Sequence, residues 1–162
     1  MRVAILLIMF VSIMYAGKLD KDWHSLSDQE RQVIYNSYCV GKQYDIGLTL
    51  AAIAWHESKG GRWQIGTRSE DYGIYHINIY WYLREIKVPV NMWNKSKYAT
   101  ILMTNPEIAE TYVITKLINL KLAYKDWGKV WSRYNGSDSR QYALDIRDKV
   151  IFLQKQFVNS IE

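Results

Sequence analysis

Cysteine, proline and phenylalanine are scarce in this chain of 162 residues. Its one cysteine, Cys39, excludes an internal disulfide, and a lone cysteine within an apolar helical pattern predicts a small buried side chain. The two prolines and nine glycines form no linker, and the chain has no internal repeat or low-complexity tract. Length and composition therefore predict one domain with one hydrophobic core.

Dense clusters of lysine and arginine are also missing, although the formal net charge is +5. A mild positive excess suits an anionic polymer, but we do not expect nucleic acid as a partner. Histidine is rare as well. The zinc-binding helix motif that His56-Glu57 begins requires a second histidine at position 60, which is Gly60. We therefore expect neither a metal nor an organic cofactor.

The N-terminus carries the longest apolar run, Val3 to Val11, which follows the positively charged Arg2. Together with the apolar residues up to Tyr15, it is shorter than the roughly 20 residues that span a membrane comfortably. With Ala16 as a plausible cleavage position, the pattern predicts an export signal over residues 1–16 and a single domain over residues 17–162. An uncleaved anchor is the alternative.

Helix signals recur along the rest of the chain. Ser27 and Glu30 form a capping box, and Asn105-Pro106 is typical of a helix start. Asp45 and Asp126 could each cap a further helix. The first expected helix begins at Ser27 and ends near Gly41. The others cover residues 46–58, 81–86, 106–124, 126–135 and 139–157. Partial alternation in residues 72–79 predicts a short strand or an extended turn. The predicted fold class is α+β, mostly α-helical, with at most a small β-hairpin or sheet.

The expected helices differ in how clearly they show a buried face. Residues 46–58 are apolar nearly all round, which predicts a central helix. In residues 106–124, the inward candidates include Ile108, Tyr112, Thr115 and Leu122.

Glu57 is the principal candidate for chemistry, because it lies at the C-terminal end of the helix expected to be central. Apolar surroundings and the negative end of the helix dipole both disfavour a charged carboxylate there. A carboxyl group that keeps its proton near neutral pH can act as a general acid. The other interpretation is a helix-end glutamate that points into solvent.

Tyrosine and tryptophan are abundant, with thirteen and seven residues against three phenylalanines. Their rings combine an apolar face with a polar edge, which suits contacts with sugars. Core filling is the other interpretation of each such ring.

Four stretches in order resemble the soluble lytic transglycosylase family, whose domain has a lysozyme-like fold. They are Ala54-Trp55-His56-Glu57-Ser58, Gly73-Ile74-Tyr75-His76-Ile77, Asn105-Pro106 and Arg133-Tyr134-Asn135-Gly136. His76 stands where the family has glutamine, and the last stretch lacks the family's alanine. Residues 69–78 also resemble a segment of animal-type lysozymes, in which the position of Asp71 holds the second catalytic carboxylate.

The resemblance implies a peptidoglycan lytic transglycosylase in which Glu57 acts first as acid and then as base, and Tyr134 binds Glu57. The implied substrate-binding residues are Ser58, Gly73, Tyr75, His76, Asn78, Tyr80, Trp81 and Asn135. Two alternatives stay open: a muramidase that uses Glu57 and Asp71, and a non-catalytic peptidoglycan-binding assembly factor. We expect a monomer, exported to the periplasm of a Gram-negative bacterium, that contacts the membrane only through its signal segment. The mixed character of the motifs and the small size of the chain also resemble the small transglycosylases that accompany secretion systems and conjugation machines, and this resemblance implies such a complex as a candidate partner.

Overall fold

The computed structural model describes residues 17–66, 69–136 and 138–157; the predicted export signal lies outside them. Residues 17–24 are helical. The helices that follow are α2 (Asp28–Lys42), α3 (Gly47–Ser58), α4 (Ile79–Glu85), α5 (Met92–Thr104), α6 (Pro106–Tyr124), α7 (Trp127–Tyr134) and α8 (Arg140–Phe157). The strands are β1 (Ile65–Gly66), β2 (Asp71–Tyr72) and β3 (Ile77–Asn78). The predicted α+β class, mostly helical with a small sheet, is confirmed.

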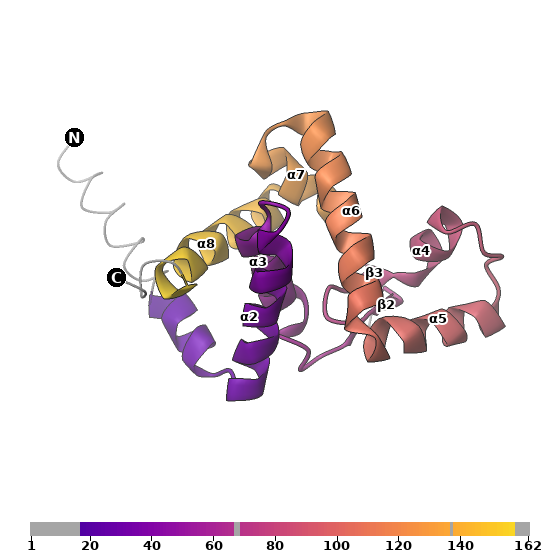
Figure 1. Ribbon diagram of the computed structural model, residues 1–162, viewed down its shortest axis with the longest axis horizontal. Helices are drawn as coiled ribbons and strands as arrows, with labels where there is room; N and C mark the ends of the chain where they lie inside the picture. Colours follow the sequence, from indigo (N-terminus) through magenta and orange to yellow (C-terminus); the bar gives the residue numbers. More distant parts are fainter. Residues whose placement is uncertain (1–16, 67–68, 137, 158–162) are drawn as a thin grey trace.

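Helix α3 occupies the centre of the core. Its residues 50–55 are completely buried, and Trp55 packs edge-on against Trp23 with ring centroids 5.2 Å apart. Helix α2 packs along one side of α3, and α8 crosses it on another (Figure 1). This burial on all sides confirms the central position predicted from the apolar sequence.

Helices α4 and α5 lie on the other side of the long helix α6 from α2 and α3 (Figure 1), and the small sheet contacts both of them. The strands pair antiparallel in the order β1-β2-β3, which sets Asp71 opposite Asn78. Gly73 makes the turn after β2 possible, because its φ of +80° disfavours any residue with a side chain. An added Cβ would also lie 2.5 Å from the Leu102 carbonyl oxygen.

Several helix ends follow the sequence signals. The Ser27 capping box is present, and Asn105 and Asp126 each accept a hydrogen bond from the first turn of the following helix. The prediction for Asp45 was wrong, because that residue adopts a left-handed conformation and α3 begins without a side-chain cap. Cys39 is exposed, not buried as predicted.

Two features of the helices were not predicted. Helix α5 was missed, since Asn94, Ser96, Thr100 and Thr104 have weak helix propensity and interrupt its pattern; Asn91 caps it. The buried face of α6 carries Ala109, Val113, Ile114 and Leu117, whereas the predicted Ile108 and Leu122 are exposed.

Candidate active site

Glu57 occupies the last turn of α3, where the helix ends against the loop between β2 and β3. Lys59 caps the helix in a left-handed conformation, and the Gly60 amide bonds back to the Ala54 carbonyl. The Ser58 hydroxyl donates to the Ile74 carbonyl at 2.7 Å and accepts from the Gly61 amide at 2.9 Å. These bonds attach the helix end to the loop that carries His76, so the two segments are positioned together.

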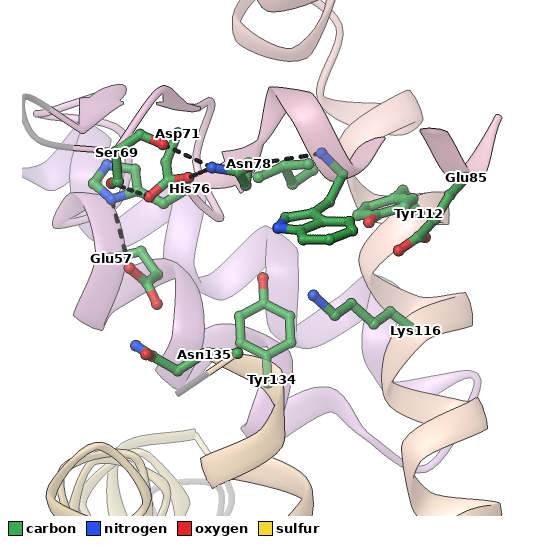
Figure 2. Close-up of a pocket in the computed structure, with 13 residues that line it drawn as sticks. Glu57, Ser69, Asp71, His76, Asn78, Glu85, Tyr112, Lys116, Tyr134 and Asn135 are labelled. Carbon is green, nitrogen blue, oxygen red and sulfur yellow. Dashed lines mark hydrogen bonds and ion pairs between the residues drawn. The ribbon is translucent and has the colours of Figure 1, made fainter. Parts of the chain in front are cut away.

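Two side chains contact the Glu57 carboxylate. The Tyr142 hydroxyl donates to Oε1 at 2.7 Å, and His76 Nδ1 lies 3.5 Å from Oε2 (Figure 2 draws the His76 contact). The Glu57 side chain is 16% exposed. The carboxyl group is therefore shielded from bulk solvent but not sealed off. This rules out a glutamate that points freely into water.

The contacts of His76 determine which of its ring nitrogens carries a hydrogen. Its Nε2 lies 2.8 Å from the Trp63 carbonyl oxygen, which can only accept, so Nε2 carries a hydrogen. In the neutral ring, Nδ1 would then present a lone pair to the Glu57 carboxylate, whereas protonation makes it a donor. Burial lowers the pKa of His76, but the contacts with Glu57 and Trp63 and the charge of Asp71 outweigh it and raise the pKa overall.

The raised pKa of His76 predicts a pH-dependent contribution to stability. The contribution is complete below the unfolded-state pKa of about 6.5 and is lost as pH rises through the higher folded-state pKa. His76→Asn, which tolerates the left-handed φ of +47°, should therefore destabilise the protein more at about pH 5.5 than at about pH 9. Urea unfolding of both proteins at the two pH values measures this. An equal difference at both would show that His76 does not gain a proton on pairing with Glu57.

Glu57 opens onto a cleft of about 570 Å³, a volume typical of ligand sites. The cleft runs between the α3 end, the sheet, α4, α6 and the α7 end, and Figure 2 shows the polar side chains that face it. The lining residues are Glu57, Ser69, Asp71, His76, Ile77, Asn78, Trp81, Glu85, Tyr112, Lys116, Tyr134, Asn135 and Gly136. Six of the predicted site residues besides Glu57 thus share one cavity with it: Asp71, His76, Asn78, Trp81, Tyr134 and Asn135.

Asp71 is held in place on the cleft wall. The Asn78 amide donates to its Oδ1 at 2.9 Å, and the Ser69 hydroxyl donates to its Oδ2. The same Asn78 amide donates to the Ser69 carbonyl, and its Oδ1 caps α4 through the Trp81 amide. Both hydrogens of the Asn78 amide are used inside the protein, so Asn78 orients Asp71. The predicted hydrogen bond from Asn78 to an acetamido group is left only the remaining acceptor capacity of its Oδ1.

Three predicted substrate-binding residues have internal roles. The Tyr75 side chain is fully buried, and its hydroxyl pairs with the Ser37 hydroxyl at 2.9 Å. Ser58 is fully buried, and its hydroxyl is used in the hydrogen bonds described above. Gly73 is buried against Leu102. Their predicted contacts with substrate were wrong, because Ser58 in one stretch and Gly73 and Tyr75 in the next pack inward and build the cleft wall from behind.

The two exposed aromatic candidates differ in position. Trp81 is 60% exposed and lines the cleft, so its ring is available to a ligand. Tyr80 does not line the cleft; its ring packs edge-on against Trp81, and its hydroxyl accepts from Arg84 at 3.1 Å. Tyr80 therefore supports Trp81.

The predicted bond between Tyr134 and Glu57 was also wrong. The Tyr134 hydroxyl donates to the Tyr75 carbonyl at 3.1 Å, and Tyr142 on α8 donates to Glu57 in its place. The two phenol rings stack at 25° with centroids 6.4 Å apart. Burial raises the pKa of Tyr142 well above its usual value, so it stays a hydrogen-bond donor throughout the accessible pH range. Tyr142 was not among the predicted site residues; its spacing with Ile146 and Leu153, which are also buried, is the signal that could have placed it on an inward helix face.

Helix α6 contributes cleft residues that were not among the predicted site residues. Tyr112 and Lys116 lie one turn apart on it, and Glu85 faces them from the end of α4 (Figure 2). Burial raises the pKa of Tyr112, and the charge of Glu85 acts in the same direction. This wall is therefore polar and contains both signs of charge.

Comparison of the chain with protein-family models, curated proteins and solved structures gave no match. In residues 17–66, 69–136 and 138–157, no group of three or more His, Cys, Asp or Glu side chains could hold a metal ion. None of the helices in the same ranges is both long and apolar enough to cross a bilayer.

Proposed function

We propose that this protein is a peptidoglycan lytic transglycosylase, which cleaves the β-1,4 bond between N-acetylmuramic acid and N-acetylglucosamine and leaves a 1,6-anhydro end. The observation that carries the proposal is the Glu57 carboxyl group, which is 16% exposed and is held between Tyr142 and His76. It faces a cleft of about 570 Å³. The ordered resemblance of four sequence stretches to that family supports the same function.

Glu57 would perform both proton transfers. Its carboxyl group protonates the glycosidic oxygen as the bond to C1 of the muramoyl ring breaks. The resulting carboxylate takes the proton of the C6 hydroxyl, whose oxygen forms the new bond to C1, so no water is consumed. The nucleophile is already part of the bound sugar, which favours the step through proximity. Tyr142 stabilises the carboxylate formed in between by a charge-assisted hydrogen bond.

A muramidase is the second candidate, because Asp71 lines the same cleft as Glu57 and is fixed by two hydrogen bonds. In a retaining mechanism the second carboxylate attacks C1, and water later releases the sugar. The reducing end formed in this way is heavier than a 1,6-anhydro end by one water.

Digestion of purified sacculi tests the proposal. We expect the wild-type protein to release muropeptides whose mass shows 1,6-anhydro ends. Reducing ends would support the muramidase instead. Absence of any released muropeptide would contradict both activities and leave a binding role.

We further propose that the protein acts in the periplasm of a Gram-negative bacterium, where it opens the wall locally for a secretion or conjugation apparatus. The apolar run at the N-terminus and the resemblance to the small transglycosylases of such machines support this. Fractionation of cells that express the full chain tests the location, and recovery only in the cytoplasm would contradict it.

Tyr142→Phe should lower kcat about 10- to 100-fold with little change in KM, because it removes a hydrogen bond to a charged carboxylate. The matched control is Tyr134→Phe, whose hydroxyl bonds to a backbone carbonyl. It should cost about 0.5–1.5 kcal/mol of unfolding free energy and change kcat less. Steady-state kinetics on sacculi and urea unfolding measure both. A larger kcat loss for Tyr134→Phe would show that Tyr134, as the family resemblance implies, is the partner of Glu57 during turnover.

A further inference from the structure

Lys116 presents an ammonium group to the cleft without a partner of opposite charge. Its side chain extends from α6 into the cleft, with Tyr134 between it and Glu57 (Figure 2). Among the described residues it makes no hydrogen bond or ion pair, and its close contact is with the Tyr134 ring, 5.0 Å from Nζ to the centroid. Lys95 and Lys59, by contrast, pair with Glu70 and Asp22.

Keeping this ammonium in the cleft is unfavourable for the free protein. Burial lowers the pKa of Lys116, and the negative charges of Glu85, Asp71 and Glu57 oppose that effect from across the cleft. A partly buried cation that no acceptor satisfies loses hydration without regaining a hydrogen bond. The N–H groups of Lys116 that do not face the Tyr134 ring are thus available to a bound molecule.

The charges around Lys116 restrict where an anionic substituent can bind. Asp71 and Glu85 line the cleft with carboxylates that repel a carboxylate of the substrate, and Glu57 adds to this repulsion whenever it has given up its proton. Lys116 is the one lysine or arginine among the lining residues that the structure describes. The other lining group that can become positive, His76, already faces Glu57 through Nδ1 and a backbone carbonyl through Nε2. Lys116 is therefore the cation among these lining residues that remains available for a charge-assisted hydrogen bond with a substrate carboxylate.

We propose that Lys116 binds a carboxylate on the lactyl-linked substituent of the muramoyl ring and thereby sets the register of the glycan strand. This inference rests on the proposed function. In a strand of alternating sugars, only every second ring carries that substituent. If the strand shifts along the cleft by one sugar, a ring without that substituent lies at Lys116 instead of a muramoyl ring. Lys116 therefore selects which of the two kinds of glycosidic bond reaches Glu57.

Lys116→Met tests the proposal, because it keeps the chain length but removes the charge. We expect kcat/KM on muramic-acid-containing strands to fall about 10- to 100-fold. Affinity for chitin hexasaccharide, which has the same backbone without the carboxylate, should stay unchanged. The proposal would be overturned if affinity for chitin hexasaccharide fell by the same factor as kcat/KM on the muramic-acid-containing strands, or if neither quantity fell. Lys116→Arg should recover part of the activity, and it serves as the second variant if Lys116→Met does not fold.

Two strand preparations identify the carboxylate. A loss on peptide-free strands assigns the contact to the lactyl carboxylate itself, and a loss confined to peptide-bearing strands assigns it to a carboxylate of the stem peptide. Both outcomes support the proposal.

Lys121→Met is the matched control for the ring contact. Lys121 lies on the same helix, and its ammonium is 4.4 Å from the Trp127 ring centroid, but it does not line the cleft. It should leave kcat/KM unchanged, and a loss equal to that of Lys116→Met would show a structural effect of α6. If the wild-type protein releases no muropeptide, the proposed function itself fails; if it does and Lys116→Met matches it, only this inference fails.

Discussion

Glu57→Gln should reduce the release of muropeptides from sacculi by about 10²- to 10⁴-fold, the range that a general acid contributes. Glutamine keeps the size of the side chain and can still accept from Tyr142, but it cannot give up or take a proton. Binding of the glycan should therefore persist while cleavage stops. Release rates measured by chromatography and mass, with affinity for glycan measured separately, test both statements. Equal release by the two proteins would show that Glu57 is not the catalytic acid.

Asp71→Asn provides the matched comparison, because it changes the second carboxylate of the same cleft. The Asn78 and Ser69 groups that bind Asp71 can partly rearrange around an amide. In a transglycosylase no second carboxylate attacks the sugar, so we expect a much smaller loss than for Glu57→Gln. A loss as large as that of Glu57→Gln, together with reducing ends in the wild-type digest, would favour the muramidase.

Gly73→Ala should be among the most destabilising single substitutions at the site, with a loss of about 2–5 kcal/mol of unfolding free energy. Two effects combine. A side chain at φ +80° strains the backbone, and the new Cβ would lie 2.5 Å from the Leu102 carbonyl oxygen, which belongs to backbone and cannot move aside easily. The displaced loop also carries His76, so activity should fall with stability.

Gly136→Ala separates these two effects. Gly136 has a nearly identical φ of +79°, but an added Cβ would meet no atom within 4 Å. It should lose about 1–2 kcal/mol from backbone strain alone. Urea unfolding of the three proteins measures the difference. If Gly73→Ala were no worse than Gly136→Ala, the close approach to Leu102 would not be part of the folded state.

Local signals in the sequence were reliable at three helix starts, although the fourth, the Asp45 cap, did not form. The Ser27 capping box and the Asn105 and Asp126 caps involve residues within one turn, and all three form. The central position of α3 followed from its apolar composition. Such features need no knowledge of the rest of the chain, because the partners are a few residues apart.

Prediction failed where several packings satisfy the same pattern. Apolar residues surround α6 nearly evenly, so periodicity could not tell the face with Val113 and Leu117 from the one with Ile108 and Leu122. In the motif around Tyr75, the order of residues did not say which side chains point into the cleft and which point away from it.

The sequence by itself determined a mostly helical α+β chain and a carboxyl group, Glu57, at the end of its most apolar helix. Only the tertiary structure decided what meets that group: Tyr142, 85 residues further along, donates to it, and Lys116 shares its cleft. The reason is that such contacts depend on how α6 and α8 pack around α3. Packing is a property of the whole core, and no short stretch of residues encodes it.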